Sequence, residues 1–260
     1  MTFMKDREGD LKESVAVESP QVEAFSPEAR SAILGLLVTL GDNKYKLGRR
    51  YSEWSTAAPT LEASVAAASM TSDQMGHARS LYPLLRQFPG APPELKREED
   101  RTEFWNVSFL DTPFRDWTDL IAVCAVFGRA LNVAVESLQE SAYEPFRHRA
   151  AKILQEEQYH RLYGDGWIEV LAREEGTRER LRAAMNRIWM ETLAWFGPDD
   201  CPVFSVAAAH SVSDADGPTL RKRFVEDLRQ AVSAVPGLGF PEDRPIPWER
   251  WDARARRLTG

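Results

Sequence analysis

The stretch that decides the fold is residues 145–174, which read PFRHRAAKILQEEQYHRLYGDGWIEVLARE. At alternating steps of four and three residues, it presents one stripe on a single helix face: Phe146, Ala150, Ile153, Glu157, His160, Gly164, Trp167 and Leu171. The stripe is apolar except at its centre, where Glu157 and His160 stand three residues apart. A Glu-x-x-His pattern is weak alone, but its place on a buried stripe makes the pair a candidate metal-binding or hydrogen-bonding centre.

Three earlier segments carry the same periodicity, and we expect four long helices at about 27–55, 60–88, 117–140 and 145–174. The first begins with Ser26-Pro27-Glu28, a capping hydroxyl followed by a proline and an acid, which is typical of a helix start. A long, proline-containing connection joins the second segment to the third, and one such crossover within four helices is the ferritin-like arrangement. We therefore predict an all-α fold, a ferritin-like four-helix bundle with one long crossover and additional C-terminal helices.

The chain outside this core divides into two ends and two further helices. Residues 1–25 are polar and aperiodic, so we expect a flexible N-terminal arm. Residues 26–235 form the ferritin-like helical domain, with the additional helices reaching about residue 196 and spanning roughly 218–235. Residues 236–260 are rich in proline and tryptophan, and we expect them to form an extension packed on the bundle.

Two of the other stripes also carry polar residues where a bundle normally places leucine. Lys44 lies in the stripe of the first helix, and Gln74 and His77 lie in that of the second. Gly128 leaves a gap in the third. Burying an unpaired polar group costs about 2–7 kcal/mol, so these side chains should meet one another or a ligand at the bundle centre. For Lys44 we expect a buried ion pair with Glu157; the alternatives are a catalytic lysine and one whose ammonium reaches solvent.

Composition limits the classes of partner. The 260 residues carry a formal net charge of -7, which disfavours nucleic acid and anionic membranes. No apolar run approaches the roughly 20 residues of a membrane span, and no hydrophobic signal stretch follows the charged N-terminus. Two cysteines, Cys124 and Cys201, in a chain of this length suggest a reducing compartment, and we expect a cytoplasmic protein.

Several blocks of the sequence resemble one family, the catalytic and structural subunits of the bacterial ring-1,2-phenylacetyl-coenzyme A epoxidase. The blocks are APTL (58–61), DQMGH (73–77), YEPF (143–146), EEQYH (156–160), NRIW (186–189), FGPDD (196–200) and LRKRFV (220–225). Two others, LGDN (40–43) and YSEW (51–54), look more like the structural than the catalytic subunit. The resemblance covers most of residues 30–240.

In the catalytic subunit of this family, the resemblance implies six residues that hold two irons. Carried over one by one, His77, Glu157 and His160 match their positions. Lys44, Gln74 and Gly128 stand where the family has a glutamate, a bridging glutamate and an aspartate. The six former di-iron positions have thus lost three carboxylates, and one carboxylate beside a lysine cannot balance two divalent cations.

Three functions follow from these observations. The first is a non-catalytic structural subunit of a multicomponent oxygenase, paired with a homologous ferritin-like subunit or with itself as a dimer, and without a cofactor. The second is a divergent monooxygenase component with a single iron, manganese or zinc on His77, Glu157 and His160, acting on an aromatic acyl-coenzyme A. The third is a protein that binds a small ligand, such as an acyl-coenzyme A, in the vacated bundle pocket. The basic run 221–223 is ordinarily a solvated helix face, but it is also a candidate for docking coenzyme A phosphates.

Overall fold

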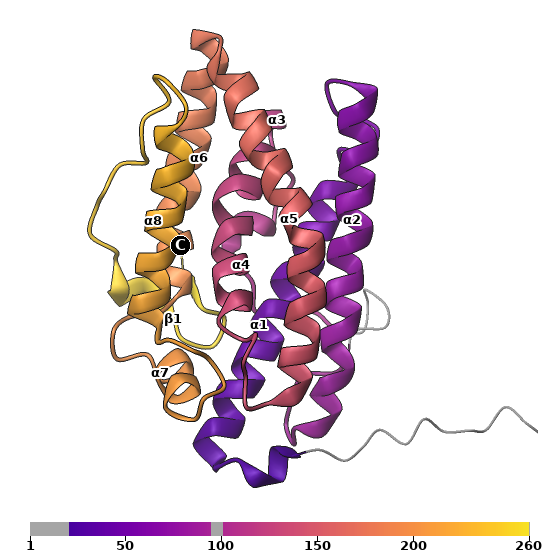
Figure 1. Cartoon of the computed structure of the whole chain (residues 1–260), viewed down its shortest axis with the longest axis vertical. Helices are drawn as coiled ribbons and strands as arrows, with labels where there is room; N and C mark the ends of the chain where they lie inside the picture. Colours follow the sequence, from indigo (N-terminus) through magenta and orange to yellow (C-terminus); the bar gives the residue numbers. More distant parts are fainter. Residues whose placement is uncertain (1–20, 95–100, 260) are drawn as a thin grey trace, which may run out of the picture.

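A computed structural model describes residues 21–94 and 101–259 of the chain. Long helices dominate it, as Figure 1 shows, and the predicted all-α, ferritin-like class is confirmed. Most of the predicted N-terminal arm, residues 1–20, lies outside the described residues. The last part of that arm forms a short 3-10 helix, η1 (Gln21–Ala24), whose Val22 is buried in the core.

The first two helices, α1 (Pro27–Ser52) and α2 (Leu61–Leu81), pack against each other along the bundle. Each begins at a hydroxyl cap: Ser26 Oγ accepts from the amide of the third residue beyond it at 3.2 Å, and Thr60 Oγ1 does the same at 3.1 Å. Both helices end earlier than predicted, at Ser52 and Leu81 and not at about residues 55 and 88. After α2 the chain tightens into the 3-10 helix η2 (Tyr82–Gln87), because Pro83 has no N–H to continue the α-helical ladder.

The third long segment is one helix with an interruption. It comprises α3 (Trp117–Ala122), a π-helical turn η5 (Val123–Gly128) and α4 (Arg129–Glu136). This segment is long and apolar enough to cross a membrane, so the expectation that no apolar run approaches that length was wrong. In the fold, 94% of its most apolar window is buried, as is usual for the core helix of a soluble protein.

Asp42 of α1 anchors the long crossover. Its side chain is 0% exposed and receives both terminal nitrogens of Arg101, at 2.6 and 2.7 Å. The backbone amide of Trp105 and the hydroxyl of Tyr82 also donate to it, at 2.7 and 3.0 Å. The stretch 101–105 of the crossover is therefore tied to the middle of α1 and, through Tyr82, to the start of η2. The crossover also contains the short 3-10 turn η4 (Ser108–Leu110).

The fourth bundle helix, α5 (Glu144–Ala172), leads directly into α6 (Glu175–Trp195). Figure 1 shows α6 and α8 (Gly217–Ser233) side by side on the edge of the molecule opposite α2. Between them in the chain lies α7 (Pro202–Ala209), which periodicity did not predict because it is only two turns long. The C-terminal extension contains a 3-10 helix, η6 (Trp248–Arg250), and a small antiparallel hairpin of β1 (Trp251–Asp252) and β2 (Arg257–Leu258).

Candidate functional site

The structure brings five of the six predicted site residues into contact in the middle of the bundle. Lys44 comes from α1, Gln74 and His77 come from α2, and Glu157 and His160 come from α5. All five are buried, with exposed fractions between 0% for Lys44 and 5% for His160. The stripe periodicity is the reason, because mid-helix positions on inward faces meet at one central volume.

Glu157 is the acceptor around which the others are arranged. Its Oε1 receives Lys44 Nζ at 2.5 Å and Gln74 Nε2 at 2.6 Å. Its Oε2 lies 3.1 Å from the side-chain nitrogen of Asn132, in the amide orientation that satisfies hydrogen bonding there. Burial alone would raise the pKa of Glu157, but the Lys44 ammonium and the neighbouring imidazoles of His160 and His77 outweigh it and hold that pKa well below its usual range.

The two imidazoles are held by a reciprocal pair of contacts between α2 and α5. His77 Nε2 lies 2.7 Å from a carboxylate oxygen of Glu156, and His160 Nε2 lies 3.0 Å from one of Asp73. The Nδ1 atoms therefore face the centre, where that of His160 lies 3.1 Å from Gln74 Nε2 and that of His77 lies 3.5 Å from Glu157. Burial lowers the pKa of His160, but hydrogen bonds to Glu157 and Asp73 and the Glu157 charge raise it overall.

Sequence reasoning missed three of these contributors, Asn132, Asp73 and Glu156. A signal existed for each. Asn132 lies one turn beyond Gly128, so it shares a face with that position, and it also reaches the Gly128 carbonyl at 3.3 Å. Asp73 and Glu156 each directly precede the inward polar residue of their helix, so the two helices repeat an acid, then Gln or Glu, then His three residues later.

Gly128, the sixth predicted position, lies at the end of the π-helical turn and offers no side chain to the centre. A Cβ placed there would meet nothing closer than the Val123 carbonyl oxygen at 3.8 Å. Space for a first side-chain carbon therefore exists at this position, and the amide of Asn132 reaches Glu157 from the same helix.

The residues at this centre do not fit the two irons that the family resemblance implies. The donors Lys44, Gln74 and Asn132 already engage both oxygens of Glu157, and an ammonium stands beside the carboxylate in place of an anion. In residues 21–94 and 101–259, no group of three or more His, Cys, Asp and Glu side chains is arranged to hold a metal ion. A pair of divalent cations here would lie beside a fixed positive charge, and Glu157 is the one carboxylate among the five inward side chains that could neutralise them.

The Tyr51 hydroxyl and the Cys124 thiol are buried close enough to Glu157 to interact with its charge. Burial raises the pKa of Tyr51 well above its ordinary value and raises that of Cys124 to about 12. The Cys124 thiol donates to the backbone oxygen of His160 at 3.4 Å. At neutral pH both groups are uncharged, so they add no anion to the centre.

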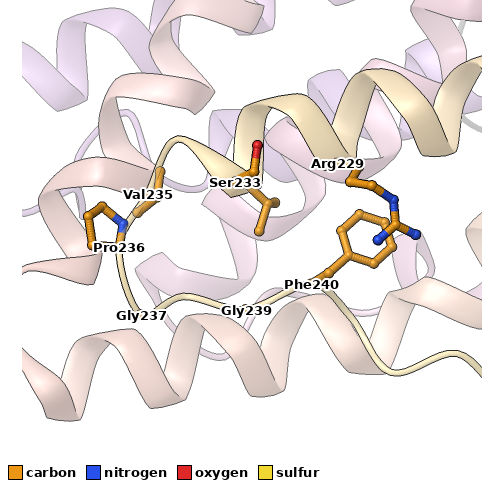
Figure 2. A pocket seen from close by; sticks show the side chains of 8 residues that line it. Arg229, Ser233, Val235, Pro236, Gly237, Gly239 and Phe240 are labelled. Carbon is orange, nitrogen blue, oxygen red and sulfur yellow. The ribbon is translucent and has the colours of Figure 1, made fainter.

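The basic run suggested for coenzyme A phosphates lies on α8, away from the residues of this centre. In the basic run, Arg221 donates to the Gly197 carbonyl at 2.5 Å and Arg223 pairs with Asp214 at 2.7 Å, so both have internal partners. A surface pocket of about 290 Å³ lies at the end of α8, and the Arg229 guanidinium there lies 4.3 Å from the centre of the Phe240 ring. Figure 2 shows the side chains that line this pocket. None of the six predicted site residues lines this pocket.

Comparison with known proteins agrees with the motif blocks. A family model described as phenylacetic acid catabolic protein matches residues 15–255. The chain belongs to this family. Within the phenylacetic acid catabolic proteins, it is 30% identical over 209 residues to one component of the 1,2-phenylacetyl-CoA epoxidase of Escherichia coli (strain K12). The aligned region covers 79% of this chain and 82% of that protein.

A second relative in the phenylacetic acid catabolic family is a different component of the same Escherichia coli epoxidase. It is 26% identical over 192 residues, which are 73% of this chain and 62% of that protein. The resemblance drawn from the motif blocks is thereby confirmed. The chain is similar to two different subunits that carry the name of one epoxidase.

Proposed function

We propose that this chain is a non-catalytic, structural subunit of a multicomponent oxygenase that pairs with a metal-bearing homologous subunit. The observation that carries the proposal is the contact of 2.5 Å between Lys44 Nζ and Glu157 Oε1. An ammonium at this place supplies the positive charge that a metal centre would otherwise supply, so the bundle keeps its central carboxylate without a metal. The site is then a stabilising network inside a subunit that does no chemistry itself.

Exposed apolar side chains support the pairing half of the proposal. The large hydrophobic residues most exposed in the described part of the chain lie on α2 and α5, which contact each other: Leu61 at 77%, Val65 at 63%, Tyr159 at 66%, Leu162 at 68% and Val170 at 44%. Where such groups on neighbouring helices adjoin, they form the kind of apolar surface that protein–protein contacts use. The relatives' names refer to subunits, which favours a homologous ferritin-like subunit, or a second copy, as the partner. The two free cysteines fit the reducing cytoplasm expected from the sequence.

Metal analysis tests the catalytic half. Protein expressed in medium rich in iron, manganese and zinc is purified, and each metal is measured per chain. We expect much less than one metal per chain in the wild type, and partial recovery of metal in the combined variant Lys44→Glu, Gln74→Glu, Gly128→Asp. A stoichiometric metal in the wild type would contradict the proposal.

Co-purification tests the pairing half. The chain is co-expressed with a homologous ferritin-like subunit from the same genome, and complexes are measured by light scattering after gel filtration. We expect a stable complex that Leu162→Asp on α5 weakens, whereas Gln230→Asp, which adds the same charge to the exposed face of α8, leaves it intact. A monomer under all conditions, alone and co-expressed, would refute the pairing.

The inward orientation of both imidazoles favours one alternative, a component with a single metal. A histidine that binds a metal usually gives its outer N–H to a carboxylate, as His77 and His160 do with Glu156 and Asp73. A metal held by the two Nδ1 atoms and Glu157 would supply Lewis-acid or oxygen-activating chemistry, but it requires Lys44 to leave the carboxylate. The same metal analysis separates the two functions.

A further inference from the structure

The C-terminal hairpin places a guanidinium in the protein interior. Arg256 lies in the turn between β1 and β2 with a φ of 56°, a left-handed conformation that is unfavourable for a residue with a side chain. Its amide donates to the Asp252 carbonyl at 2.7 Å, which fixes this turn. The side chain is 1% exposed and reaches both the end of α6 and a ring of α7. Burying this cation therefore costs free energy twice, once for the left-handed backbone of Arg256 and once for removing its guanidinium from water.

No carboxylate in the described part of the chain pairs with Arg256. Nη2 donates to the Trp195 carbonyl at 2.5 Å, Nη1 lies 3.8 Å from Cys201 Sγ, and Nε has no hydrogen-bond partner. The guanidinium also lies 4.8 Å from the centre of the Phe204 ring. An arginine in a protein does not lose its charge, and a buried unpaired charge is costly. Among these contacts, the Cys201 thiol is therefore the group that can become an anion.

The position of Cys201 brings its sulfur close to a second source of positive potential. It is the residue before the first turn of α7, where the helix presents unsatisfied N–H groups and the positive end of its dipole. Two other charged residues lie near this end of α7, Arg221 and Asp199. Arg221 on α8 donates to the Gly197 carbonyl, and the largely exposed Asp199 pairs with Arg221 at 3.5 Å. The charge in direct contact with the sulfur is therefore the buried guanidinium.

We propose that Cys201 is a peroxide-sensitive thiol whose anionic forms are stabilised by Arg256. The thiolate sulfur attacks one oxygen of a hydroperoxide and forms an S–O bond while the O–O bond breaks. The sulfur is oxidised by two electrons to a sulfenic acid, and the peroxide is reduced, with hydroxide or an alkoxide leaving and taking a proton from water. The guanidinium is placed to donate a hydrogen bond to the thiolate and then to the sulfenate oxygen.

Cys124 provides an internal control within the same chain. Its exposed fraction is 4%, against 5% for Cys201, so exposure alone predicts similar reactivity for the two thiols. Burial and the nearby charge of Glu157 raise the pKa of Cys124 to about 12, which keeps it a thiol. A large difference between the two cysteines would therefore report their electrostatic surroundings.

Peroxide labelling tests the proposal. The folded protein is treated with hydrogen peroxide in the presence of dimedone, which traps sulfenic acid, and both cysteine peptides are followed by mass spectrometry. We expect Cys201 to be labelled faster than Cys124 by on the order of tenfold or more, and the difference to vanish in urea. Equal rates in the folded protein, or no labelling of Cys201, would overturn the proposal.

Variants assign the effect to the guanidinium. Arg256→Gln should slow labelling of Cys201 by about tenfold, because the thiolate loses the cation beside it. Arg256→Lys should retain most of the rate. Arg254→Gln, at an exposed position of the same hairpin, should leave it unchanged. An unchanged rate in a folded Arg256→Gln protein would refute the role of this residue. If that variant does not fold, the comparison of the two wild-type cysteines decides.

Discussion

Replacing Lys44 with methionine isolates the electrostatics of the bundle centre. Methionine approximates the length of the side chain but removes the ammonium that lies 2.5 Å from Glu157. Both partners are nearly inaccessible, with exposed fractions of 1% and 2% for the side chains, so solvent cannot screen the charge that remains. Removing one partner of such a pair costs about 3–5 kcal/mol, which lowers the folded-to-unfolded ratio by roughly two to three and a half powers of ten.

The free energy of unfolding is measured by urea denaturation at pH 7, followed by tryptophan fluorescence and circular dichroism. Lys46→Met is the matched control, since this lysine lies two positions further along α1, and its pair with Asp111 is partly exposed, at 21% and 39%. We expect the control to cost less than about 1 kcal/mol. The double variant Lys44→Met, Glu157→Gln should recover most of the loss, because no charge remains buried.

Two results would refute this reasoning. The first is an equal cost for Lys44→Met and Lys46→Met, which would mean that Glu157 keeps its charge without help from Lys44. The second is a double variant less stable than Lys44→Met alone. The pH dependence offers a further check: the cost of Lys44→Met should shrink in acid, where Glu157 takes up a proton and becomes neutral.

Three further predictions concern stability. Asp42→Asn leaves Arg101 without its carboxylate, and thermal or urea unfolding should show a loss of about 3–5 kcal/mol. The lowered pKa of Glu157 means that its charge stabilises the fold above the unfolded value near 4.5 and that this contribution disappears as pH falls below it; acid titration of Glu157→Gln should be less steep than that of the wild type. Gly217→Ala should abolish or severely reduce folding yield, because its Cβ would lie 2.4 Å from a backbone oxygen, whereas Gly128→Ala has room at 3.8 Å and should remain soluble and folded in circular dichroism. Similar behaviour of the two alanine variants would contradict this packing.

The fold was predictable because helical periodicity is a local property of the sequence. The stripes at steps of three and four residues located the long helices, and the caps at Ser26 and Thr60 mark two of their starts. The errors came from features that periodicity does not record. Pro83 converted the end of the second helix to a 3-10 helix, and a π-helical turn interrupted the third. The two-turn α7 and the small hairpin were too short to show a period.

At the bundle centre, the sequence determined which side chains face inward, since a position on a helix stripe fixes the direction of its side chain. It could not determine which atoms meet, because that depends on how far each helix is shifted along its axis and rotated about it relative to its neighbours. Only the tertiary structure gave Glu157 three donors from three helices, and only it paired His77 with Glu156 and His160 with Asp73.

The same division holds for the charges that lie outside the helix stripes. Asp42 and Arg101 are 59 positions apart in the chain, and Arg256 and Cys201 are 55 apart, so no local pattern relates them. The sequence by itself determined the helices and the family, and through the family resemblance it predicted the loss of three carboxylates from the centre. The packing of distant segments decided which charges were buried and with what partner, because the cost of burying a charge depends on neighbours that the chain supplies only after it folds.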